Sequence, residues 1–221
     1  MNYLFVIIAT LAIGLGAQAL IKATYRKWNK VPVPTGLTGA QAARKMLDAN
    51  GLYNVQIKQI PGELSDNFDP QTNVVSLSRD IYASRSVAAT AVACHECGHA
   101  VQHACGYTPG KVRTAIVPVV NFASNLWIFV LMIGIFMQML GLIYVAIILY
   151  VAVIAFQLVT LPVELNASSR ALSYIDSYVR LPQEQYGGAR SVLTAAALTY
   201  VAAALASLLN LLWLLGMARN N

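Results

Sequence analysis

The sequence predicts a mainly α-helical membrane protein with four spanning helices and a small α+β subdomain outside the bilayer. Of the 221 residues, 57% are hydrophobic and only 11% are charged, whereas a soluble domain is about half apolar and a quarter charged. Three stretches, residues 1–21, 114–163 and 191–218, contain no charged residue, as a bilayer core requires. The polar remainder contains helix and strand patterns and a His-Glu-x-x-His motif.

The composition also excludes several classes of protein. So much apolar sequence excludes a disordered chain, and so few charges exclude an ordinary water-soluble globule. Three cysteines without a paired spacing exclude a small secreted fold that is held together by disulfides.

Four apolar segments are long enough to span a bilayer. A spanning helix needs about 20 apolar residues, because the hydrocarbon core is roughly 30 Å thick and each helical residue rises about 1.5 Å. Burial of these helices in a soluble core is disfavoured, because the chain has too little polar surface to enclose them. The segments cover residues 3–20, 119–137, 142–161 and 192–217.

The first segment can be interpreted as an uncleaved anchor or as a signal peptide. The tripeptide at 17–19 resembles a cleavage site. However, no basic residue precedes the segment, and a basic cluster that begins at Lys22 follows it directly. Basic residues after a first span hold that side in the cytoplasm, so we expect an anchor.

The distribution of Lys and Arg predicts the orientation in the membrane. With both termini outside, residues 22–118 and 162–191 face the cytoplasm, and only Arg219 among the 15 Lys and Arg residues lies outside. The positive-inside rule favours this orientation. It also accounts for the net charge of +6, so we expect no nucleic-acid partner.

Residues 22–118 form the only sizeable region outside the predicted spans. Thr38 and Gln41 make a capping-box pattern, which starts a helix that is expected to end near residue 50. Ser86 is expected to cap a second, longer helix that runs to about residue 104.

Between these two helices the sequence predicts two strands. Apolar and polar residues alternate over 53–57, and residues 73–77 form a second candidate. The segment 66–70 between them is rich in turn residues. Asp66 and Asp69 are therefore expected to shape a turn, with a role in a site as the alternative.

The longer helix carries His95-Glu96-Cys97-Gly98-His99, which is a His-Glu-x-x-His motif. Residues four apart lie on one helix face, so both imidazoles can bind one ion, and imidazole is a good ligand for Zn2+. Glu96 can take a proton from a zinc-activated water as that water attacks a carbonyl. The motif predicts His95 and His99 as metal ligands and Glu96 as the catalytic base; a His–Glu pair in a core is the alternative.

Three protein ligands and a water are usual for catalytic zinc, so a third ligand must come from elsewhere. Glu164 is the best candidate, because it is the first charge after 50 uncharged residues and the hairpin returns it to the side of the motif. An ion pair with Arg170 is its alternative role. His103 lies one turn too far along the helix, and Cys105 would need a turn of the chain that Gln102 does not favour.

At these residues the chain resembles the bacterial YugP-type neutral zinc metallopeptidases. The likeness covers most of residues 1–217, including the four-span layout. It implies a membrane-embedded zinc peptidase with a zincin-like subdomain. Together with the orientation given by the Lys and Arg residues, we expect it in the bacterial inner membrane with its active site on the cytoplasmic side. The segments that carry the resemblance are residues 64–70, 93–102 and 162–168.

The resemblance also implies site residues. His95 and His99 would be ligands and Glu96 the base, and kinship with gluzincins implies a third ligand from a later helix, which matches Glu164. Many gluzincins place an Asp four residues after that Glu to orient a ligand His. Here that position is Ser168, so Asn166 or Ser168 is expected to take this role.

The resulting prediction is a zinc-dependent endopeptidase whose partners are the lipid bilayer and peptide or protein substrates, with membrane-protein quality control as a candidate role. A homo-oligomer is compatible with the sequence. The alternative is a catalytically inactive zinc-binding scaffold; a metal transporter is disfavoured, because the predicted spans contain neither charge nor His. The expected parts are an anchor (1–21), a cytoplasmic zincin-like subdomain (22–118), a transmembrane hairpin (119–161), a cytoplasmic segment with the third ligand (162–191) and a C-terminal span (192–217).

Several other residues have open roles. Cys94, Cys97 and Cys105 are expected to be reduced and buried, with an inhibitory ligand as the alternative for Cys97. Residues 73–77 could form an edge strand that pairs with a substrate backbone, as the resemblance to zincins implies. The candidates for stabilising the oxyanion are Arg170, Tyr107 and Tyr174.

Overall fold

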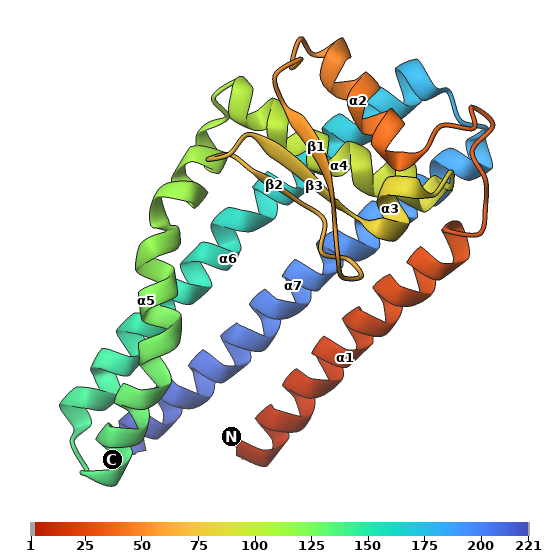
Figure 1. The fold of residues 1–221 in the computed structure, drawn as a ribbon. Coiled ribbons are helices and arrows are strands. Elements are labelled where there is room, and N and C mark those ends of the chain that lie inside the picture. The colour runs from red at the N-terminus through yellow and green to blue at the C-terminus, as the bar shows by residue number, and fades with distance from the viewer. Residues whose placement is uncertain (1–2, 221) are drawn as a thin grey trace. The chain divides into compact units, whose positions relative to one another are not determined.

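The computed structural model describes residues 3–220, so Met1 and Asn2 of the expected anchor and the final Asn221 lie outside the described residues. Within that range, four helices are long and apolar enough to cross a membrane (Figure 1). The prediction of four spanning segments is therefore confirmed by length and composition. These helices are α1 (Tyr3–Trp28), α5 (Thr108–Phe136), α6 (Leu140–Tyr174) and α7 (Gln183–Asn220).

The helices extend beyond the apolar segments that predicted them. Helix α6 continues through Pro162, where the third span was expected to have ended, and it carries Glu164 on the same continuous helix. A short π-helix, η1 (Ile175–Val179), follows, and Arg180 in the left-handed region ends it. The expected cytoplasmic segment 162–191 is therefore mostly helical.

The chain divides into two compact units. The first comprises the residues up to Gln18, Lys111–Pro162 and the residues from Leu198 onwards. It has a core that includes Leu131, Tyr150 and Leu214, yet many of its large apolar side chains are exposed, and Phe136 is 90% exposed. An apolar surface of this extent is typical of a unit that faces lipid.

The second unit comprises Ala19–Gly110 and Val163–Ala197. Helices α2 and α4 pack against each other, and α4 also contacts the sheet. Its most deeply buried side chains include Met46, Leu47 and Ile81. The elements lying wholly within it are α2 (Gly39–Ala49), β1 (Gln56–Ile60), β2 (Asn67–Asp69), β3 (Val74–Ser78), α3 (Arg79–Ala83), α4 (Val87–Ala104) and η1.

Local capping explains where α2 and α4 begin. Thr38 and Gln41 form both hydrogen bonds of a capping box at the start of α2. The Ser86 hydroxyl accepts a hydrogen bond from the Ala89 amide at the start of α4. Both helix predictions are confirmed, whereas the short helix α3 was not expected.

The sheet differs from the expected pair of strands. Its order is β1-β3-β2, with β1 parallel and β2 antiparallel to β3. The first strand starts later than expected, at Gln56, because Tyr53 lies in an exposed turn. The prediction that residues 73–77 form an edge strand is wrong, because β2 forms within the segment that was expected to be a turn.

Asp66 explains why this segment pairs with β3. Its carboxylate accepts hydrogen bonds from the Ser78 amide at 2.7 Å and the Ser78 hydroxyl at 3.2 Å. The chain is thereby held beside β3 where β2 begins. Asp69 shapes the following turn, as expected, by accepting hydrogen bonds from the Gln71 amide and the Thr72 hydroxyl.

Candidate metal centre

Helix α4 brings the motif into the interior of the second unit. Much of the helix is built from small residues that are completely buried, such as Ala89 and Ala93. His95 and His99 lie one turn apart with ring centroids 4.8 Å apart, and each side chain is only 13% exposed. Glu96 is 8% exposed. The small residues thus leave room for polar side chains in a closely packed part of the second unit.

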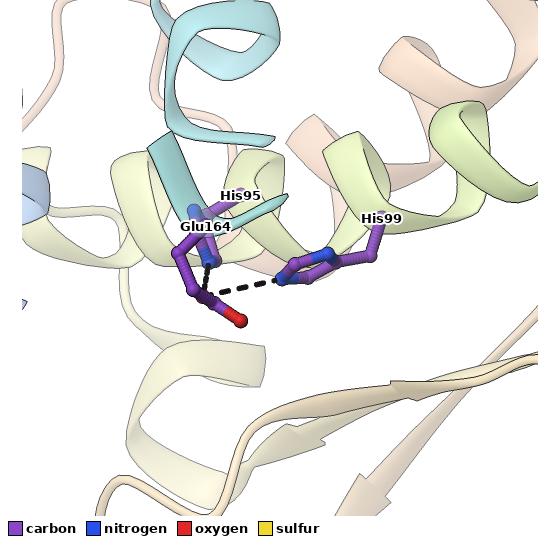
Figure 2. A group of neighbouring side chains, drawn as sticks. All are labelled: His95, His99 and Glu164. Atoms are coloured by element: carbon purple, nitrogen blue, oxygen red, sulfur yellow. Dashed lines mark hydrogen bonds and ion pairs between the residues drawn. The ribbon is translucent and has the colours of Figure 1, made fainter. Parts of the chain in front are cut away.

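Helix α6 contributes Glu164 to the same place. Its Oε2 lies 3.3 Å from His95 Nε2 and 3.5 Å from His99 Nε2. Dashed lines in Figure 2 mark these two contacts. The carboxylate side chain is 5% exposed, and one ligand atom from each of the three residues lies within 4.8 Å of the others. The structure therefore brings together the three residues that the sequence predicted as metal ligands.

Two of the three separations between the ligand atoms of this group match a zinc site, and all three atoms lie within 4.8 Å of one another. Ligand atoms held tetrahedrally about 2.0–2.2 Å from zinc lie about 3.3–3.6 Å from one another. The separations of 3.3 and 3.5 Å from Glu164 to the two imidazoles agree with that value. Two imidazole nitrogens and one carboxylate oxygen are also a donor set that catalytic zinc uses.

The other ring nitrogen of each histidine has a hydrogen-bond partner. Ser168 Oγ lies 3.1 Å from His95 Nδ1, and Gln102 Oε1 lies 3.0 Å from His99 Nδ1. Of the two residues expected to orient a ligand, Ser168 therefore contacts His95, whereas Asn166 contacts Gln102 instead. Sequence reasoning missed the contact of Gln102, although its position three residues after His99 is a usable signal.

Gly98 sets the spacing between α4 and α6. A Cβ atom at this position would lie only 2.5 Å from the backbone carbonyl oxygen of Ala167. The two helices therefore approach more closely than any other residue would permit. This close contact adjoins the parts of α4 and α6 that carry the three predicted metal ligands.

Burial sets the electrostatics of the motif. Desolvation raises the pKa of the Glu96 carboxyl, although the nearby His95 and His99 act in the opposite direction. Burial alone would lower the pKa of His99, but the Glu164 carboxylate 3.5 Å from its Nε2 and the charge of Glu96 outweigh burial and raise that pKa. Glu96 is therefore a carboxylate whose proton affinity is enhanced, as suits a general base.

The three cysteines occupy two environments. Cys94 and Cys97 are buried, as predicted. The Cys97 thiol donates to the Ala43 carbonyl oxygen of α2 at 3.5 Å. The prediction for Cys105 is wrong: this residue is exposed, because it follows the last turn of α4 as its C-cap.

The remaining candidates lie around the centre or away from it. Arg170 donates through Nε to Asn166 Oδ1 at 2.8 Å and contacts the Cys105 sulfur at 3.5 Å. The His103 ring is 6.0 Å from that of Phe68. Tyr174 stacks on the ring of Tyr178, with centroids 5.1 Å apart, and Tyr107 is half-buried beyond the end of α4.

Comparisons with known proteins agree with this geometry. A family model described as "Putative neutral zinc metallopeptidase" matches residues 3–219. A Bacillus subtilis (strain 168) protein, "Putative membrane protease YugP", is 46% identical over 212 residues, which are 96% of this chain and 94% of the relative. No solved structure matches the chain.

Proposed function

Because the chain belongs to the family described as "Putative neutral zinc metallopeptidase", we propose that it is a membrane-embedded endopeptidase that hydrolyses peptide bonds at this centre. The observation that carries the proposal is the convergence of His95, His99 and Glu164 from two helices. These three residues would hold zinc, and the buried Glu96 of the same motif would act as the base.

The roles of the residues follow from their positions. Zinc, when bound, would lower the pKa of a coordinated water to about 7 and polarise the scissile carbonyl. The Glu96 carboxylate accepts a proton from the attacking water and then donates it to the nitrogen of the leaving amine. The Ser168 hydroxyl holds Nδ1 of His95, so that Nε2 faces Glu164.

We place residues 22–118 and 162–191 on the cytoplasmic side of the membrane. Fourteen of the 15 Lys and Arg residues lie in these two segments, which supports this orientation through the positive-inside rule. Alkaline phosphatase fused after the C-terminus is then expected to be active, whereas a fusion at residue 107, between α4 and α5, is expected to be inactive. The reverse result would contradict the orientation.

The substrates that we propose are peptides and unfolded proteins, including membrane proteins in quality control. This proposal is supported by the four helices that are long and apolar enough to cross a membrane, because a peptidase held in a bilayer meets membrane proteins and chains that reach the bilayer surface.

The central experiment replaces the proposed base. Glu96→Gln is expected to keep one zinc per chain and to lose cleavage of a broad peptide library by at least about a hundredfold, because removing a general base typically costs 10²–10⁴-fold. Glu184→Gln, on an exposed residue at the start of α7, is the matched control and should cleave like the parent.

Two results would contradict the proposal. If Glu96→Gln cleaves the library as fast as the parent, Glu96 is not the base. If the zinc-loaded parent cleaves no peptide or denatured protein, the alternative of an inactive zinc-binding scaffold is favoured.

A further inference from the structure

We propose that Gln102 is a positioning residue that fixes the ring of His99 and ties it to the turn of α6 that carries Glu164. The inference rests on the proposed function, because it treats His99 and Glu164 as ligands of one metal ion. Gln102 is 3% exposed, and its amide makes three hydrogen bonds. A buried amide with this many partners is held in a single orientation.

The surroundings of Gln102 determine which way its amide points. Its Nε2 lies 2.7 Å from the backbone carbonyl oxygen of Val163. A carbonyl oxygen only accepts hydrogen bonds, so the atom facing it must be the NH2 group. The carbonyl oxygen of the same amide, Oε1, therefore faces His99 Nδ1 at 3.0 Å.

This orientation decides the tautomer of His99. Because Oε1 only accepts, Nδ1 of His99 must carry the proton and donate it. Nε2 then has a free lone pair, and this is the nitrogen that lies 3.5 Å from Glu164 Oε2. Gln102 thus holds the imidazole in the form that a metal ligand requires.

Ser168 cannot do the same for His95. A hydroxyl can donate or accept, so the contact between Ser168 Oγ and His95 Nδ1 is compatible with either tautomer. The two histidines of the motif therefore differ: the ring of His99 is fixed by an amide, and that of His95 is held by an adaptable hydroxyl.

The same amide connects the two helices. Val163 immediately precedes Glu164, so the bond from Gln102 Nε2 anchors the backbone beside the proposed third ligand. Nε2 also lies 3.0 Å from Asn166 Oδ1. That oxygen accepts a bond from Arg170 Nε as well. One side chain of α4 thereby contacts both a proposed histidine ligand and the turn that presents the carboxylate.

The first test measures zinc affinity. Gln102→Leu removes all three hydrogen bonds at similar volume, and we expect it to weaken zinc binding about 10- to 100-fold in competition with a chromophoric chelator. Gln185→Leu is the matched control, because Gln185 also donates its amide to a backbone carbonyl, that of Pro32, at 3.3 Å. It should bind zinc within about threefold of the parent.

A second readout separates positioning from a loss of packing. Cobalt bound in place of zinc reports ligand geometry through its visible absorption bands. Gln102→Leu is expected to shift these bands, and Gln185→Leu is expected to leave them unchanged. Unchanged zinc affinity and unchanged cobalt bands in a folded Gln102→Leu protein would overturn the proposal.

The tautomer is tested in the parent protein, so this test does not depend on a variant that folds. The chain contains only three histidines, and ¹⁵N-histidine labelling therefore gives one pair of ring-nitrogen signals, Nδ1 and Nε2, for each of three imidazoles. In zinc-free protein at a pH where imidazoles are neutral, His99 is expected to carry its proton on Nδ1; a proton on Nε2 would overturn the proposal. None of these readouts measures peptidase activity. A negative result in them therefore counts against the role of Gln102 alone, whereas an active Glu96→Gln variant would overturn the proposed function.

Discussion

Replacing Gly98 by alanine should loosen the metal centre without touching any proposed ligand. The added Cβ would lie 2.5 Å from Ala167 O and 3.1 Å from Ala167 C and Cα, whereas an ordinary contact begins at 3.4 Å. All three neighbouring atoms belong to the backbone, so no side chain can rotate away. Helix α4 and helix α6 must therefore separate by about 0.9 Å, the difference between 3.4 and 2.5 Å.

That displacement is large on the scale of the centre. It would stretch the 3.1 Å contact between Ser168 and His95 to about 4.0 Å, beyond the range of a hydrogen bond. Overpacking costs about 1–3 kcal/mol, and the better helix propensity of alanine offsets about 1 kcal/mol of that cost. We expect a net loss of stability of about 0–2 kcal/mol and zinc binding that is at least about tenfold weaker.

Gly187→Ala isolates the clash. A Cβ at Gly187 on α7 meets nothing within 4 Å, so this variant gains helix propensity with no steric cost. The two variants should therefore differ by about 1–3 kcal/mol, which corresponds to about 2–4 °C in Tm per kcal/mol for a chain of this size. Thermal unfolding in detergent, with and without zinc, measures the difference. Equal Tm values and equal zinc affinities for the two variants would refute the reasoning.

Two further predictions concern buried ionisable groups. Burial raises the pKa of Cys94 to about 12 and also raises that of Cys97, so iodoacetamide at pH 8 should alkylate only the exposed Cys105 in folded protein, as mass spectrometry would show; rapid alkylation of all three would contradict the burial. Burial also raises the pKa of Asp66, although its hydrogen bonds to Ser78 act in the opposite direction. Folding therefore favours the neutral form of this carboxyl. Its contribution to the stability of the parent is lost as the pH rises from about 3.9, the usual pKa of an unfolded Asp. Asp66→Asn should keep the hydrogen bonds and, in zinc-free protein, gain stability relative to the parent between about pH 4 and pH 7; a difference independent of pH would count against this account.

The parts of the fold that were predictable are those with local signals. The capping box at Thr38 and the hydroxyl cap at Ser86 fix where two helices begin, and both depend only on residues within one turn. Long uncharged segments likewise predict helices without any knowledge of their neighbours. Local chemistry was therefore sufficient for these elements.

Strand β2 was missed because it depends on a contact that is distant in the sequence. Its residues read as a turn, and they pair with β3 where Asp66 accepts hydrogen bonds from Ser78, twelve residues away. No periodicity within three residues can predict such a strand. The central position of β3 follows from the same contact.

The candidate site was predictable as far as its chemistry has a fixed spacing. His95, Glu96 and His99 follow from the motif, and Glu164 was selected because it is the first charge after the hairpin. The contact of Gln102 with α6 requires knowledge of how α4 and α6 pack, which the sequence does not contain.

The ordering of these residues along the chain has a consequence for biosynthesis. His95 and Glu164 are 69 residues apart, and the hairpin of α5 and most of α6 is translated between them. A nascent chain that has been synthesised only as far as α4 contains His95 and His99 but lacks Glu164. Both apolar helices of this hairpin must therefore be synthesised before the three side chains can meet, so a half-made chain contains no assembled centre.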